Sequence, residues 1–434
     1  MFHTLVFVSL LLIVNALPRY IVRSVSPTSC GFNAVLSLSH PSTIHGEPLE
    51  QTLFASLSCH SASNLRFTVR SSVDRWIVPD VVQPSSPAPA HDLHVTLPRV
   101  NYPFAFSVHR HQEELFSFNS SLLMTEHYLE LTGSLPPALV ITGLGYRKHP
   151  LFLKRSEKYG FWNRDEPGLP PQRPAYSTHP LLLASAPFHS SRGFFFLNSN
   201  AMEVELTLDS FVFRSSGGII DLFLYSGPSP SDVINQHQEV VGSPVAIPIF
   251  ALGWMQARWG WKTIDDVIGV VDDYDRDQIP LDVLFFDIDY MQKYYDFTVD
   301  PDRYPLKKLS KFIKILKSRG VSIIPIVDPG IPIDSKYFGY SELLKSKAFL
   351  TQRNSSQPQE GTVWPGRTIF PDFSHPNALP YWRSMLSSFL QSFDFDGLWI
   401  DMNEPASFVT EDHPVIDFDW NNPPWKPSFS VNQN

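Results

Sequence analysis

Apolar and polar residues alternate in short runs along the first half of the chain. The alternation is clear at 65–70 and 202–208, the runs at 211–214 and 219–225 continue the β pattern, and turn residues such as the Gly217-Gly218 pair separate the runs. A period of two is that of a β-strand with one buried face, and many short strands between turns are typical of a β-sandwich. We therefore predict an N-terminal β-sandwich domain over residues 17–245.

After residue 245 the pattern changes to apolar runs that alternate with amphipathic segments of helical period. Strands are expected at 248–252, 281–286, 321–327 and 397–400, helices at 263–275, 306–319 and 376–393, and a loop at 361–366. Buried strands that alternate with helices indicate a parallel sheet covered by helices, an α/β architecture. Residues 246–434 are therefore predicted to form the first half of a (β/α)8 TIM-type barrel.

Acidic residues follow three of these predicted strands. They are Asp287 and Asp289, then Asp328, then Asp401. A TIM barrel places such residues around its active-site mouth, and a doubly wound sheet also binds ligands at the carboxyl ends of its strands. No Gly-x-Gly-x-x-Gly follows a strand, which argues against a dinucleotide cofactor. A single aspartate can simply end a strand, whereas three consecutive strand ends favour a binding site.

Tryptophans lie near the same strand ends. Trp259 and Trp364 fall in predicted loops, and Trp399 precedes an aspartate by two residues. Aromatic rings pack against the C–H faces of sugars while carboxylates bind the hydroxyls, so the combination favours a carbohydrate site. The alternative is that these rings fill the core, which is the usual role of a tryptophan within an apolar run.

Glycoside hydrolysis needs two carboxyl groups around the scissile bond, one ionised and one with a raised pKa. Asp401, at the end of a buried strand, is the candidate nucleophile. Glu404 follows three residues later, where its carboxyl can orient or tune Asp401. Two structural alternatives stay open: Asp401 caps the next turn, and Glu404 is solvated.

Composition narrows the function further. The formal net charge is −9 and no dense basic patch is visible, which argues against a nucleic-acid partner. With two cysteines, Cys30 and Cys59, a cysteine-based zinc site is excluded, and the histidines lack metal-ligand spacing, so we expect no metal and no cofactor. The two cysteines either pair in an oxidising compartment or stay as buried thiols.

The first residues suggest a route through the secretory pathway. An apolar run of about ten residues precedes Ala16, too short to span a bilayer and typical of a signal peptide, predicted over residues 1–16. No later run is long enough to serve as a membrane anchor. Sequons at Asn119 and Asn354 are candidate glycosylation sites, which fits a lysosomal or extracellular destination.

The run Trp-Ile-Asp-Met-Asn-Glu-Pro at 399–405 resembles the signature of the α-glucosidases of glycoside hydrolase family 31. Further blocks resemble the family in the same order, at 162–165, 196–202, 251–260, 280–291, 326–329 and 363–373. The resemblance implies a retaining, exo-acting α-glucosidase that hydrolyses terminal α-linked glucose from maltose- or glycogen-type oligosaccharides through a covalent glycosyl-enzyme.

The resemblance also implies roles for individual residues. Asp401 is the expected nucleophile, Glu404 supports it, Asp287 binds the hydroxyls of the terminal sugar, and Asp165 reaches the same pocket from a loop of the β-domain. The remaining residues are expected to form pocket walls: Trp259, Ile326, Asp328, Trp364, Trp399 and Met402.

One departure from the family pattern bears on activity. The family's acid/base aspartate lies roughly a hundred residues after the nucleophile, beyond Asn434. The 434-residue chain is therefore expected to be weakly active or inactive alone, and the missing half of the barrel is a possible partner. The alternative function is a non-catalytic protein that binds sugar or serves as a partner subunit.

Overall fold

The computed structural model describes residues 18–79, 81–85, 92–163, 173–174, 176–187, 189–352, 354–408 and 423–428. The expected signal peptide lies outside these residues. The chain divides into two compact units, residues 1–244 with 418–434, and residues 245–417.

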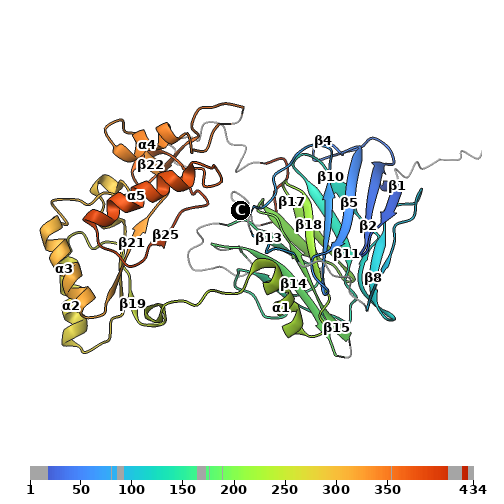
Figure 1. The fold of residues 1–434 in the computed structure, drawn as a ribbon, viewed down its shortest axis with the longest axis horizontal. Helices are drawn as coiled ribbons and strands as arrows, with labels where there is room; N and C mark the ends of the chain where they lie inside the picture. The colour runs from blue at the N-terminus through green and yellow to red at the C-terminus, as the bar shows by residue number, and fades with distance from the viewer. Residues whose placement is uncertain are drawn as a thin grey trace, which may run out of the picture. The chain divides into compact units, whose positions relative to one another are not determined.

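The first unit is built on two antiparallel sheets (Figure 1). The larger sheet has the order β1 (Tyr20–Pro27), β2 (Phe32–Leu38), β5 (Thr52–Cys59), β6 (Asn64–Arg70), β18 (Ile220–Tyr225), β15 (His189–Phe196), β14 (His179–Ala186) and β12 (Val140–Gly145). The second has the order β10 (Leu122–Met124), β11 (Leu129–Ser134), β17 (Ser210–Ser215), β16 (Met202–Leu206) and β13 (Glu157–Phe161). Smaller sheets pair β7 (Leu93–Thr96), β8 (Phe106–Arg110) and β9 (Glu113–Phe118), and β3 (Thr43–Ile44) with β4 (Glu47–Pro48).

The core of this unit lies between the two main sheets. Alternate side chains of β2, β5 and β6 join those of β11, β16 and β17 in one buried cluster, which includes Phe67, Phe194 and Phe211. The predicted β-sandwich is therefore confirmed. Cys30 and Cys59 form a disulfide at its edge.

A helix in this unit was not expected. Helix α1 (Pro230–Val241) packs on β14, β15 and β18, and it begins with a capping box in which Ser229 and Asp232 bond each other's backbone amides. The reading of 17–245 as wholly β was wrong here, because the turn-like Ser-Pro-Ser run also supplies an N-cap and a proline in the first helical turn.

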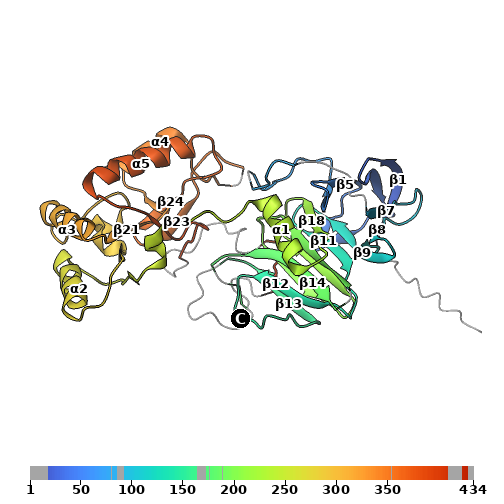
Figure 2. The same ribbon diagram turned by 60° about the horizontal axis from the view of Figure 1, so that its bottom comes forward.

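The second unit contains a four-stranded parallel sheet with the order β19 (Met255–Gln256), β20 (Val283–Phe286), β21 (Ser322–Val327) and β25 (Trp399–Ile400). Helices α2 (Ile264–Arg276) and α3 (Leu306–Ser318) each connect two successive strands of this sheet. Helices α4 (Phe338–Ser346) and α5 (Ala378–Ser392) both lie between β21 and β25 in the chain. Helices α2 and α3 lie side by side along the sheet (Figures 1 and 2). The expected partial TIM barrel is confirmed.

Two expectations in this unit were wrong. The apolar run at 248–252 is not a buried strand but the short 3-10 helix η1 (Ile249–Leu252), whose Ile249 is 84% exposed. The expected loop at 361–366 is a hairpin of β23 (Glu360–Val363) and β24 (Gly366–Ile369), to which β22 (Ile331–Pro332) adds a third strand. No helix among the described residues is long and apolar enough to cross a membrane.

Candidate active site

Three aspartate side chains lie on one face of the parallel sheet, at the carboxyl ends of its strands. In the parallel register Phe285 pairs with Ile324, and Ile326 pairs with Trp399. Side chains two residues apart in a strand share a face. Asp287, Asp328 and Asp401 each lie two positions after one of these paired residues. Their side chains are therefore on the same face of the sheet. The structure thus brings together carboxylates that are up to 114 positions apart in the sequence.

Asp328 is the buried member of this set, with only 4% of its surface exposed. Burial raises the pKa of its carboxyl to about 8, and the negative charges of Asp401, Asp287 and Glu404 add to the shift. Its Oδ1 atom is buried and has no hydrogen-bond partner among the described residues. A carboxyl that is neutral at mildly acidic pH can donate a hydrogen bond to a ligand hydroxyl.

Asp287 is held at the start of the loop after β20. Its Oδ1 accepts the backbone N–H of Ile288 at 2.7 Å. Burial raises the pKa of Asp287 although this hydrogen bond opposes the shift, and the charges of Asp289 and Asp401 raise it further. The carboxylates at the ends of β20 and β25 are therefore close enough to influence each other's protonation.

Two of the three tryptophans predicted for the site lie on loops of this unit, close to each other. The Trp259 and Trp364 ring centroids lie 6.4 Å apart, and the rings are 63% and 43% exposed. The indole N–H of Trp364 donates to Sδ of Met402 at 3.1 Å. Trp399 stays in the sheet, where its ring meets the edge of Phe285. Two predicted pocket residues are thus exposed aromatic surfaces, as a sugar platform requires.

The loop after β25 is fixed by the hairpin that sequence reasoning missed. The backbone N–H of Phe408 donates to the carbonyl of Thr362 at 2.7 Å, and the Thr362 N–H donates to Oγ of Ser407 at 3.1 Å. Trp364 sits in the hairpin turn and packs on Phe408. The hairpin therefore positions both Trp364 and the segment that carries Met402 and Glu404.

The remaining predicted site residues fall in different places. Ile326 is buried beneath the strand ends, with 2% exposed, and Glu404 is exposed beside them. Asp165 lies outside the described residues. Asn119 and Asn354 are exposed, as an acceptor asparagine must be.

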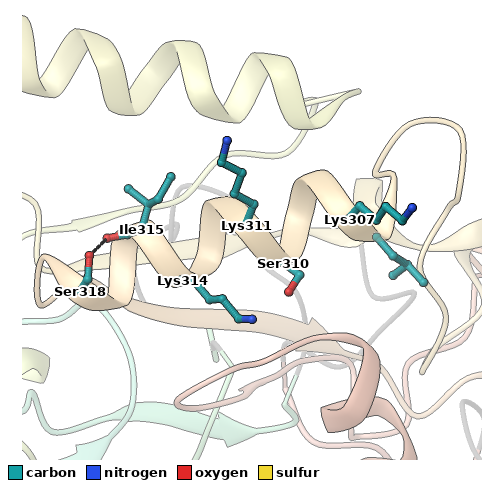
Figure 3. Close-up of a pocket in the computed structure, with 7 residues that line it drawn as sticks. Lys307, Ser310, Lys311, Lys314, Ile315 and Ser318 are labelled. Atoms are coloured by element: carbon teal, nitrogen blue, oxygen red, sulfur yellow. Dashed lines mark hydrogen bonds between the residues drawn. The ribbon is translucent and has the colours of Figure 1, made fainter.

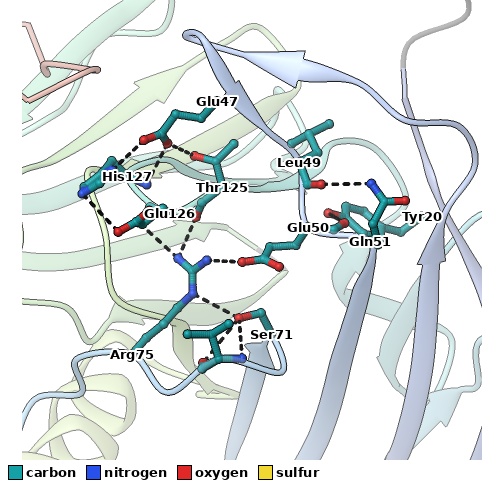
Figure 4. Close-up of polar contacts among 11 residues, drawn as sticks. Tyr20, Glu47, Leu49, Glu50, Gln51, Ser71, Arg75, Thr125, Glu126 and His127 are labelled. Carbon is teal, nitrogen blue, oxygen red and sulfur yellow. Dashed lines mark hydrogen bonds and ion pairs between the residues drawn. The ribbon is translucent and has the colours of Figure 1, made fainter.

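Two other polar features lie away from the strand ends. A shallow depression on α3 is lined by Leu306, Lys307, Ser310, Lys311, Lys314, Ile315 and Ser318 (Figure 3). In the first unit, Glu47 approaches His127 and Glu126 (Figure 4). Its Oε2 already accepts from the Thr125 hydroxyl and the His127 amide, and its Oε1 lies 2.6 Å from Nδ1 of His127. These contacts tie β4 to the turn between β10 and β11, and we assign no metal to them.

Comparison with known proteins places this geometry in a family. Residues 244–432 match the glycosyl hydrolases family 31 TIM-barrel domain, and residues 92–205 match the glycosyl hydrolase 31 N-terminal galactose mutarotase-like domain. Lysosomal alpha-glucosidase of Mus musculus is 35% identical over 406 residues, which are 90% of this chain and 41% of that protein. Alpha-xylosidase 1 of Arabidopsis thaliana is 34% identical over 71% of this chain and 34% of that protein.

Solved structures agree on the fold. The glucosidase II alpha subunit covers 90% of this chain with a TM-score of 0.76 at 21% identity, and the alignment spans 51% of that subunit. A family 31 dextranase of Flavobacterium johnsoniae gives a TM-score of 0.71 at 20% identity, over 91% of this chain and 49% of the dextranase. The chain spans less than half the length of the curated relatives it matches.

Both domain matches, in the order in which the sandwich and the partial barrel occur here, come from one family, and curated relatives align over most of the chain. The chain belongs to glycosyl hydrolase family 31.

Proposed function

We propose that this chain carries the nucleophile half of the active site of a retaining, exo-acting α-glucosidase. The observation that supports it is the position of Asp401, directly after β25 and close enough to Asp328 and Asp287 to raise the pKa of each carboxyl. In this mechanism Asp401 attacks the anomeric carbon and forms a glycosyl ester while the glycosidic bond breaks and an acid/base group protonates the departing oxygen. Water, deprotonated by the same group, then hydrolyses the ester with net retention.

The neighbouring carboxyls bind the terminal sugar. The neutral Asp328 carboxyl donates a hydrogen bond to one sugar hydroxyl, and Asp287 accepts from another. Trp259 and Trp364 supply the aromatic surface, and Glu404 supports the nucleophile through its charge.

A complete active site needs more of the barrel. Among the described strands β25 has a partner on one edge only, and Ile400 on it is 73% exposed. Buried-type strands with open edges invite pairing. We propose that further barrel strands pair there and supply the acid/base, as part of the same protein or of a partner. The glucosidase II catalytic subunit has itself been solved with a binding domain of a regulatory subunit.

The destination proposed is the secretory pathway, lysosomal or extracellular. The apolar N-terminal run, the disulfide between Cys30 and Cys59, and the exposed sequon asparagines Asn119 and Asn354 support it.

Isothermal titration of the purified chain with maltose, xylose and glucose tests this function. We expect maltose and glucose to bind and xylose to bind more weakly, with little or no turnover of maltose by the 434-residue chain. Rapid maltose hydrolysis by this chain, abolished in Asp401→Asn, would show that the acid/base lies within it. A folded chain that binds none of the three sugars would contradict the proposal.

A further inference from the structure

A buried carboxyl outside the strand-end set holds the backbone of the site. Asp296 lies in the loop after β20 and is 1% exposed, and its Oδ1 accepts the backbone N–H of Asp328 at 2.7 Å. The carbonyl of Asp296 in turn accepts the hydroxyl of Tyr337 at 2.6 Å. This residue therefore connects the loop after β20 and the segment before α4 to the end of β21.

The Asp328 amide needs this partner. The ladder between β21 and β25 ends with the pair Val327 and Ile400, so the Asp328 N–H lies one residue beyond it. A buried N–H without an acceptor is costly, and a carboxyl oxygen replaces the missing strand carbonyl. A second bond supports the same strand end, because the hydroxyl of the fully buried Tyr290 donates to the carbonyl of Ile326 at 2.6 Å.

The loop that carries Asp296 adopts a strained backbone. Lys293, Tyr294 and Phe297 have φ values of 55°, 60° and 60°, in the left-handed region that bulky residues avoid. Such strain persists where surrounding contacts fix it, and here the Phe297 ring packs edge-on against Trp382 of α5. The backbone on both sides of Asp296 is thus held so that its carboxyl points at β21.

We infer that Asp296 is a positioning residue of the active site: its buried carboxyl, through the backbone amide of Asp328, fixes the direction in which the Asp328 side chain enters the sugar pocket. The inference rests on the proposed function, since it assigns Asp328 to the sugar. Burial first, and then the nearby Asp328 charge, raise the pKa of Asp296 well above its usual value. The neutral carboxyl works as a hydrogen-bond acceptor of fixed orientation, a task that an amide oxygen can also perform.

Three variants of the full chain separate this role from general stability. Asp296→Leu removes the acceptor at similar size, and Asp296→Asn keeps an acceptor oxygen. Tyr381→Phe is the matched control, because it removes a buried hydroxyl whose hydrogen bond goes to the Gly339 carbonyl at 3.1 Å and not to the Asp328 amide. Each variant is measured by amide hydrogen exchange at Asp328 and by titration with maltose.

The expected pattern is specific. Asp296→Leu exposes the Asp328 amide to exchange and weakens maltose binding by about tenfold, since small misplacements of binding groups have large effects. Asp296→Asn and Tyr381→Phe keep both the protection and the affinity of the parent chain. Unchanged exchange in Asp296→Leu, lost protection with unchanged affinity, or an Asn variant as impaired as the Leu variant would each overturn the inference. If the parent chain binds no maltose, the proposed function fails, and the exchange result still decides whether Asp296 holds the Asp328 amide.

Discussion

Replacing Asp328 by Asn tests whether the buried Asp328 carboxyl keeps its proton in the folded chain, as the structure indicates. Burial, with the charges of Asp401, Asp287 and Glu404, moves the pKa of Asp328 from 3.8 to about 8 on folding. The folded chain keeps this proton while the unfolded chain has lost it, so the free energy of unfolding decreases as pH rises between these values. Below the lower pKa and above the higher pKa, Asp328 binds the same number of protons in both states, so it does not make the unfolding free energy depend on pH.

Asp328 contributes at most about 1.4 kcal/mol per pH unit to the pH dependence of the unfolding free energy, because the folded and unfolded states differ by one bound proton at this residue. Asn does not titrate, so Asp328→Asn should lose that part of the slope and keep the rest. Urea unfolding at several values between about pH 5 and about pH 7, followed by tryptophan fluorescence, measures it. Six of the ten tryptophans lie in the barrel unit, which makes this signal report mainly on that unit.

Asp302→Asn is the matched control, because Asp302 is an aspartate of the same unit that is exposed rather than buried. We expect this control to follow the parent chain at every pH. Equal slopes in the parent chain and in Asp328→Asn would refute the reasoning, because they would show that the Asp328 carboxyl titrates alike in the folded and unfolded states.

Three further predictions concern other parts of the chain. Trp364→Ala should weaken maltose binding by about 1 kcal/mol in calorimetry, because it removes an aromatic surface and its bond to Met402, while the thermal midpoint of the barrel unit changes little. Replacing Cys30 and Cys59 by Ala opens a loop of 29 residues and should lower the unfolding free energy of the sandwich by about 3 kcal/mol in urea, an effect that reduction of the parent chain should reproduce. Ser229→Ala should cost about 1 kcal/mol in the same assay through the lost N-cap of α1, and Ser229→Asp should restore most of it.

Much of the barrel unit could be predicted because its local signals agree with its packing. The apolar run at 281–286 contains β20, and a Gly stop follows α3, so Asp287 and Asp328 could be placed at strand ends from the pattern alone. The run at 248–252 is equally apolar, yet it forms an exposed 3-10 helix, since apolar character without periodicity does not separate a strand from other structures.

Other features depend on contacts that a local pattern does not carry. The hairpin of β23 and β24 turns at Trp364-Pro365 and uses Gly366 at φ 95°, so its turn residues looked like a loop. Asp296 follows no strand directly. It accepts a hydrogen bond from the backbone amide of Asp328, which lies 32 positions later in the sequence. Its role depends on how the loop folds against β21 and α5, which only the tertiary structure reveals.

The central claim, that Asp401 is a nucleophile that forms a glycosyl ester, can be tested without the acid/base. A 5-fluoro-α-glucosyl fluoride carries a leaving group that departs without protonation, so the first step needs only the nucleophile and the sugar pocket. The chain is incubated with this reagent, digested and sequenced by mass spectrometry. The account predicts one fluoroglucosyl group on Asp401, and none in Asp401→Asn. Stoichiometric labelling of another residue, or equal labelling of Asp401→Asn, would contradict it.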